Sequence, residues 1–185
     1  MDKIKELLKI GDLRTDGNAA QVAELVLKDK KRLVELIPCL DDPDSAIRSH
    51  AAHAVEAITR VKPDWMTADL RHIILRAESD AYPIVRWHIA MTLGNLAGHM
   101  KDAQPAVESL LRSLTDTSPL VRSWSVHSLV LIGRKHPDFT PRILTALRAH
   151  EKDRSPSVRS RVNRAITLLQ FPDMPVPAVW VKKRG

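Results

Sequence analysis

Asp116-Thr-Ser-Pro-Leu-Val-Arg122 is the stretch of sequence that decides the fold, because close variants of it recur along the chain. In every copy an Asp stands six positions before an Arg, and Ile or Val directly precedes the Arg. The Arg residues of successive copies lie 38, 36 and 37 positions apart. The other copies are Asp42-Pro-Asp-Ser-Ala-Ile-Arg48, Asp80-Ala-Tyr-Pro-Ile-Val-Arg86 and Asp153-Arg-Ser-Pro-Ser-Val-Arg159. A repeat of this length is typical of stacked pairs of α-helices.

Each copy of the motif predicts the start of a helix. Ser45, Ser118 and Ser155 are placed to supply an N-cap oxygen, and Pro suits the first helical turn. After each Arg, apolar residues recur at the 3.6-residue spacing of a packed helix, as at Val121, Val126, Leu129 and Ile132. Partner helices are predicted over Asp29–Leu40, Asp64–Ala77, Ala103–Leu114 and Phe139–Ala149. The expected fold class is all-α, a right-handed α-α superhelix of about four to five helical pairs.

The motif Asp-x-x-Pro-x-Val-Arg at intervals of 36–38 residues resembles the HEAT repeat. On this resemblance the chain is one solenoid, with a degenerate N-terminal pair (1–28), repeats over 29–62, 63–99, 100–135 and 136–170, and a Pro-rich tail (171–185). The resemblance also implies that the Asp and Arg of the motif form a hydrogen-bonded ladder between successive repeats. Its members would be Asp42, Arg48, Asp80, Arg86, Asp116, Arg122, Asp153 and Arg159.

In HEAT proteins the second helix of each pair lines the concave surface, and the resemblance places there the second and fifth positions after each motif Arg. Those positions hold His, Met, Trp and Arg, which are common binding anchors. We therefore expect another protein or a peptide to bind at His50, His53, His88, Met91, Trp124, His127, Arg161 and Arg164. The alternative for Trp124 is that it fills a gap between adjacent repeats.

The same residues do not predict a metal site or a catalytic centre. Neighbouring helices lie roughly 8–10 Å apart, which is too far for histidines on different helices to share a metal, and no Cys or carboxylate joins them at ligand spacing. No Ser/His/Asp grouping, glycine-rich phosphate loop or CxxC pair is present. The expected function is a non-catalytic scaffold without a cofactor.

The positive charge of the chain leaves nucleic-acid binding open as the alternative function. The formal net charge is +7, and residues 136–185 carry +6 of it. Arg161 and Arg164 stand one turn apart in this region, either as a solvated end of the stack or as an anion site. Some HEAT-like proteins are DNA glycosylases with concave Trp side chains and a catalytic Asp, but the predicted concave positions here offer only Glu56, near an edge. Another branch of short HEAT-like proteins is named for phycobilin lyases, and no residue of this chain selects that role.

Localisation and the tail complete the expectations. The single Cys39, an N-terminus without a signal peptide and the lack of a long apolar run predict a cytoplasmic protein without a membrane span. Three Pro between positions 172 and 177 predict an extended tail. We expect Val179, Trp180 and Val181 to fold over the exposed face of the last helical pair. Docking of the tail into another protein is the alternative, and the oligomeric state is not predicted.

Overall fold

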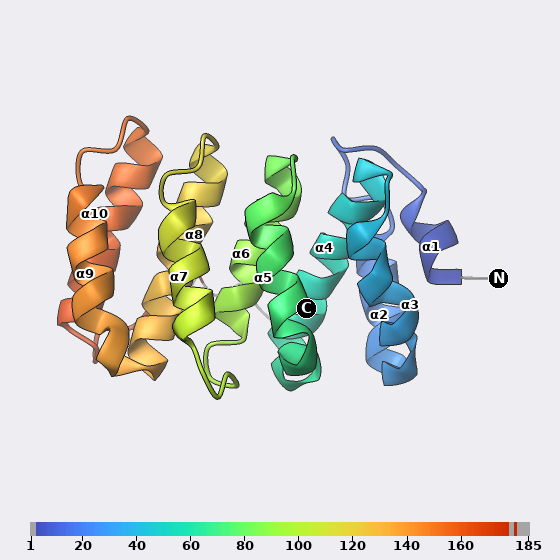
Figure 1. Ribbon diagram of the computed structural model, residues 1–185, viewed down its shortest axis with the longest axis horizontal. Helices are drawn as coiled ribbons and strands as arrows, with labels where there is room; N and C mark the ends of the chain where they lie inside the picture. Colours follow the sequence, from blue (N-terminus) through green and yellow to red (C-terminus); the bar gives the residue numbers. More distant parts are fainter. Residues whose placement is uncertain (1–2, 178–179, 181–185) are drawn as a thin grey trace.

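The computed structural model describes residues 3–177 and Trp180, and these form a row of helices connected by short turns (Figure 1). Val179 and Val181 of the expected tail contact lie outside the described residues. The helices are α1 (Lys3–Leu8), α2 (Ala19–Lys28), α3 (Leu33–Leu36), α4 (Ser45–Val61), α5 (Leu70–Ser79), α6 (Pro83–Asn95), α7 (Gln104–Ser113), α8 (Pro119–Lys135), α9 (Thr140–Ala149) and α10 (Pro156–Gln170). Short 3-10 segments, Lys30–Arg32, Ile37–Asp41, Pro63–Asp69 and Pro137–Phe139, flank α3 and lead into α5 and α9. The expected all-α stack of helical pairs is confirmed.

The helices form two layers. The second helices of the pairs, α4, α6, α8 and α10, pack side by side, and α2 extends this row at its N-terminal end. The first helices, α3, α5, α7 and α9, form the layer at the front of Figure 1. We call the side of the α4–α6–α8–α10 row that faces away from the first helices the second-helix face. Within the described residues, no helix combines the length and the apolar character that a membrane crossing requires.

The motif starts each second helix in a different way from the one expected from the serines. Ser118 and Ser155 occupy the N-cap positions, but their side chains make no capping hydrogen bond. The motif Asp instead closes the turn before the helix, since Asp116 Oδ1 accepts from the N–H of Ser118 at 2.7 Å. In the first copy Asp44 is the N-cap and accepts from the N–H of Ala46 at 2.8 Å, so Ser45 is already helical. A carboxylate can satisfy a free N–H more strongly than a hydroxyl does.

The motif Arg and Asp residues connect consecutive repeats. Arg48, Arg86 and Arg122 each donate through Nη1 to the carbonyl of their own motif Asp and through Nε and Nη2 to the carboxylate of the next motif Asp. These inter-repeat pairs, with their Nε distances, are Arg48–Asp80 at 2.7 Å, Arg86–Asp116 at 2.7 Å and Arg122–Asp153 at 2.8 Å. Because the pairs are largely buried and use the planar fork of the guanidinium, they fix the spacing of the repeats.

The two ends of this ladder differ from its middle. At the first rung Lys5 of α1 takes the place of an Arg and lies 2.6 Å from the Asp42 carboxylate. At the last rung Arg159 donates to the carbonyl of Asp153 at 2.7 Å, and the motif does not recur after it in the given sequence. The short α1–α2 pair therefore joins the stack through a different cation.

The central second helices are buried on nearly all sides. Along α6 and α8 the neighbouring helices approach so closely that a Cβ on Gly94 would lie 2.9 Å from the Cβ of Ser128. Ser128 also donates to the carbonyl of Ala90 across this contact, at 2.7 Å. Side chains on the second-helix face of α6 and α8 are therefore less exposed to solvent than a helix with a single apolar stripe would predict.

Candidate interaction surface

Burial corrects the expectation that the second and fifth positions after each motif Arg form an open row of anchors. His50, His88, Met91 and His127 are all at most 5% exposed. His53, Trp124 and Arg161 are half-buried, and only Arg164 is exposed. The neighbouring repeats, the N-terminal loop and the tail cover this row, so that sequence position alone overestimated its accessibility.

The ring of His50 connects the N-terminal pair, α1 and α2, to the first repeat. Its Nδ1 lies 2.8 Å from the carbonyl oxygen of Leu8, and its Nε2 lies 3.2 Å and 3.1 Å from those of Asp12 and Thr15. Gly17, with a positive φ of 50°, allows the loop to come this close, because a Cβ there would stand 2.6 Å from the ring. The contacts of this histidine are therefore structural and intramolecular.

His53 and His88 lie together on adjacent second helices. Their rings stack with centroids 4.6 Å apart, and His53 Nδ1 is 3.3 Å from the Asp16 carboxylate. The ring of Trp87 is tilted against that of His88 at 5.7 Å. Among the described residues no group of three or more His, Cys, Asp or Glu side chains is arranged to hold a metal ion.

An aromatic cluster occupies the second-helix face between α8 and α10. The ring of His127 contacts Trp124 at 5.4 Å and Trp180 of the tail at 5.3 Å. The guanidinium of Arg161 stands over both indoles, 4.8 Å from Trp124 and 5.3 Å from Trp180. We call Trp124, His127, Arg161 and Trp180 the aromatic cluster. It combines edge-on and tilted ring contacts with cation–π contacts, which gain strength as water is excluded.

The cluster shifts the acid–base behaviour of its members. Burial lowers the pKa of His127 to about 3, and the positive charge of Arg161 acts in the same direction. His127 Nδ1 has no hydrogen-bond partner in the described part of the chain. Burial also lowers the pKa of Arg161, although an Arg side chain stays protonated in proteins. At neutral pH the cluster therefore holds a neutral imidazole beside a cation.

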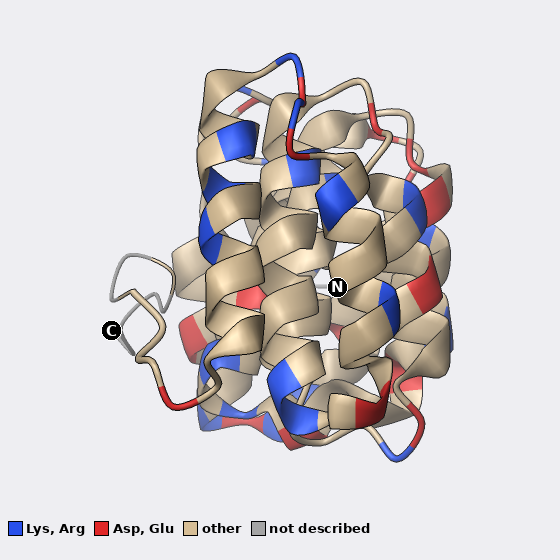
Figure 2. Cartoon of the chain, turned by 90° about the vertical axis from the view of Figure 1, so that its left-hand side faces the viewer, with Lys and Arg blue, Asp and Glu red and all other residues tan. Residues whose placement is uncertain are grey.

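Arg134 of α8 holds the tail through main-chain carbonyls. Its Nη2 donates to Leu168 at 2.9 Å, to Phe171 at 3.5 Å and to Met174 at 2.5 Å. The tail therefore runs along the second-helix face, which corrects the expectation that it folds over the end of the last pair. In Figure 2, which looks at the α9/α10 end, the described tail residues 171–177 lie beside the helices and do not cross that end.

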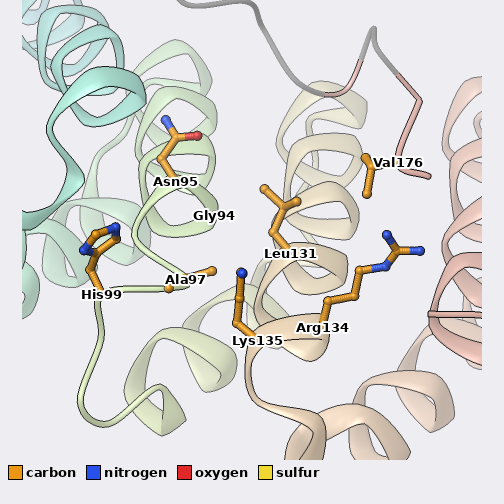
Figure 3. Close-up of a pocket in the computed structure, with 9 residues that line it drawn as sticks. Gly94, Asn95, Ala97, His99, Leu131, Arg134, Lys135 and Val176 are labelled. Atoms are coloured by element: carbon orange, nitrogen blue, oxygen red, sulfur yellow. The ribbon is translucent and has the colours of Figure 1, made fainter. Parts of the chain in front are cut away.

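A cavity of about 560 Å³ lies next to the tail, between the C-terminal halves of α6 and α8. Figure 3 shows Asn95 and His99 on one side of it and Leu131, Arg134 and Lys135 on the other, with Val176 of the tail nearby. Sequence reasoning missed this cavity because Val176 comes from a segment whose path the repeat does not dictate.

A buried polar network also escaped the sequence analysis. Glu56 of α4 is 1% exposed and pairs with Arg60 one turn later. Asn95 of α6 donates to the Glu56 carboxylate at 3.4 Å and to Thr59 Oγ1 at 3.1 Å. Glu56 is thus engaged in packing α4 against α6, which is not the setting of a carboxylate that meets a substrate.

Arg161 and Arg164 do not form one site. Arg161 is enclosed by the indoles of the aromatic cluster, whereas Arg164 points to solvent from α10. Figure 2 shows further Lys and Arg residues on the helices and turns of this end. The exposed cations of the last repeat include Arg142, Arg148, Lys152 and Arg154.

Comparison with known proteins agrees with this architecture. Residues 70–167 match a family model described as HEAT repeats. A chain from the complex of CpcE and CpcF of phycocyanin lyase from Nostoc sp. PCC7120 superposes with a TM-score of 0.71 at 25% identity, covering 88% of this chain and 96% of that one. A computationally designed armadillo repeat protein for modular peptide recognition superposes with a TM-score of 0.67 at 16% identity, covering 90% and 80%. No curated protein sequence matches the chain significantly.

Proposed function

The chain belongs to the HEAT-repeat family, and on that premise we propose that it is a protein-interaction module that binds a short partner segment on its second-helix face. The proposal concerns the surface made by α6, α8 and α10. It places the partner across the aromatic cluster and along the cavity beside Leu131.

The observation that carries the proposal is that this face already holds a segment of chain from outside the repeat helices, with a turn at residues 171–174. Arg134 donates only to main-chain carbonyls of the tail and of the end of α10. Every peptide presents carbonyls, so such contacts hold a backbone without depending on its sequence. The aromatic cluster then supplies a place for one large side chain, which is how a few anchors dominate many interfaces.

Membership of a lyase-type complex is a second candidate function. The matching chain from Nostoc comes from a complex of two components, CpcE and CpcF, and it is matched over almost its whole length. Here the partner would be a second subunit. Incubation of the chain with phycocyanin apoprotein and phycobilin, alone and with candidate second subunits, tests this by covalent pigment attachment on denaturing gels.

Photo-crosslinking tests the proposed surface. A photoreactive residue at Leu131, on the second-helix face, is compared with one at Arg71, which is exposed on α5 of the first-helix layer. We expect the same partner to crosslink from position 131 and not from position 71. Crosslinking from position 71 alone would place the partner on the opposite side and reject the proposal.

A further inference from the structure

We infer that the tail, described over residues 171–177 and at Trp180, is an intramolecular occupant of the partner site, and that the partner segment that displaces it is a short, proline-containing segment with an aromatic anchor. The inference rests on the proposed function and adds two things to it. It gives the chemistry of the partner, and it makes binding conditional on opening of the tail.

The anchor is the first line of support. Trp180 is 7% exposed although it belongs to a segment outside the repeats. Its indole meets His127 of α8 and Arg161 of α10, so one side chain of the tail touches two successive repeats. A tilted imidazole and a guanidinium over the ring accept any flat aromatic side chain, because neither contact requires a particular hydrogen-bonding group on it.

The backbone of the tail is the second line of support. Pro172, Pro175 and Pro177 keep the tail out of an α-helix and remove three N–H donors. The expectation that the tail is extended is wrong at residues 171–174, which form a turn in which the Met174 N–H donates to the Phe171 carbonyl at 3.0 Å. The carbonyls of Phe171 and Met174 are the groups that Arg134 recognises. A proline-containing segment from another protein reproduces this pattern with little loss of conformational freedom.

The incomplete fit of the tail is the third line of support. Phe171 is 59% exposed, while the cavity beside Val176 keeps a volume of about 560 Å³. A partner that places a larger side chain between Asn95 and Leu131 gains contacts that Val176 does not make. Better filling of this cavity gives a competing segment its advantage over the tail.

Tethering keeps the tail in place until a competitor arrives. A segment attached by a few residues has an effective concentration in the millimolar range, so even a weak contact is mostly closed. A partner segment must therefore bind tightly enough to compete with the tail at this effective concentration. The free protein is therefore expected to bind a given segment more weakly than a variant whose tail is released.

Binding of the tail sequence in trans tests the inference on the full chain. The probe is a fluorescein-labelled synthetic peptide of residues 171–185, titrated with wild type, Trp180→Ala and Trp65→Ala. Trp65 is the matched control, because it is half-buried on the 3-10 segment before α5 and contacts Lys30 rather than the tail. We expect Trp180→Ala to bind the peptide at least about tenfold more tightly than the other two.

Two further measurements check the role of the anchor and allow for a loss of stability in the Trp180→Ala protein. A peptide that carries Trp180→Ala should not bind any of the proteins, since it lacks the anchor. If the Trp180→Ala protein melts early, Val176→Asp releases the tail at its other contact and should give the same gain.

Equal peptide binding by wild type, Trp180→Ala and Val176→Asp would overturn the inference, and so would dimerisation of the wild type through exchanged tails in sedimentation. These outcomes leave the proposed function standing if a partner still crosslinks from position 131. Absence of a partner crosslink from position 131 would reject the proposed function, whatever the result of the peptide titration.

Discussion

Arg122 and Asp153 form a bidentate pair in which both hydrogen bonds measure 2.8 Å, although 31 residues separate them in sequence. Arg122 is 3% exposed, and its Nη1 also donates to the carbonyl of Asp116 at 2.7 Å. One side chain thereby joins the motif of its own repeat to the motif of the next.

Removal of Arg122 should destabilise the whole stack. Arg122→Ala leaves the Asp153 carboxylate buried without its cation, which costs about 3–5 kcal/mol and lowers the melting temperature by roughly 6–20 °C for a chain of this size. Thermal melts followed by circular dichroism measure the change. Arg164→Ala, at an exposed position on the neighbouring helix, is the control and should melt within a degree or two of wild type. An unchanged melt for Arg122→Ala would count against the ladder as a source of stability.

The buried imidazole of His127 should make the protein less stable in mild acid. Its pKa is lowered to about 3 by burial, whereas an unfolded His has a pKa near 6.5. The unfolded state therefore binds the proton first, and the free energy of unfolding falls by about 1.4 kcal/mol per pH unit as the pH drops from about 6.5 towards 3. The Arg122 hydrogen bond lowers the pKa of Asp153, so the stability that this pair contributes is lost only as the pH falls below about 4.

His127→Phe separates these two effects. Phe keeps a ring in the aromatic cluster and cannot be protonated, so denaturation at pH 8 and pH 5 should show a loss for wild type that is about 2 kcal/mol larger than for the variant. Urea titrations at both pH values provide the measurement. Identical losses for the two proteins would mean that His127 is protonated freely in the folded state.

His50 should control the order of the N-terminal pair. His50→Ala removes the ring that contacts the carbonyls of Leu8, Asp12 and Thr15, while the ladder stays intact. We expect faster hydrogen exchange over residues 3–28 by mass spectrometry, with little change in α6 and α8. Uniformly faster exchange along the chain would show instead that His50 supports the global fold.

The basic end of the stack allows a direct check of the nucleic-acid alternative. If partner binding on the second-helix face is the function, DNA and RNA gel shifts at low salt should disappear by about 150 mM salt, as for non-specific contacts of a few cations. A shift that persists at that salt, and is lost on Arg148→Glu with Arg154→Glu, would favour nucleic acid as the ligand.

The Asp–Arg ladder could be predicted from the sequence, but the burial of the second-helix face could not. Asp116 and Arg122 belong to one short motif, and their pairing with the next repeat follows from the regular 36–38-residue period. The burial of His50 and His127 depends on segments outside the repeat, the α1–α2 loop and the tail. Trp180 was expected over the exposed face of the last helical pair, but its position against α8 and α10 depends on Arg134 and the aromatic cluster, which no local pattern encodes. The Glu56–Asn95 contact joins residues 39 positions apart and likewise has no sequence signal of its own.

The most direct test of the account is the affinity of a purified partner, once crosslinked from position 131, for four proteins measured by calorimetry. The proteins are wild type, Leu131→Glu on the second-helix face, Arg71→Glu on the first-helix layer and Trp180→Ala in the tail. We predict at least about tenfold weaker binding for Leu131→Glu, unchanged binding for Arg71→Glu and tighter binding for Trp180→Ala. Weaker binding for Arg71→Glu together with unchanged binding for Leu131→Glu would contradict the account.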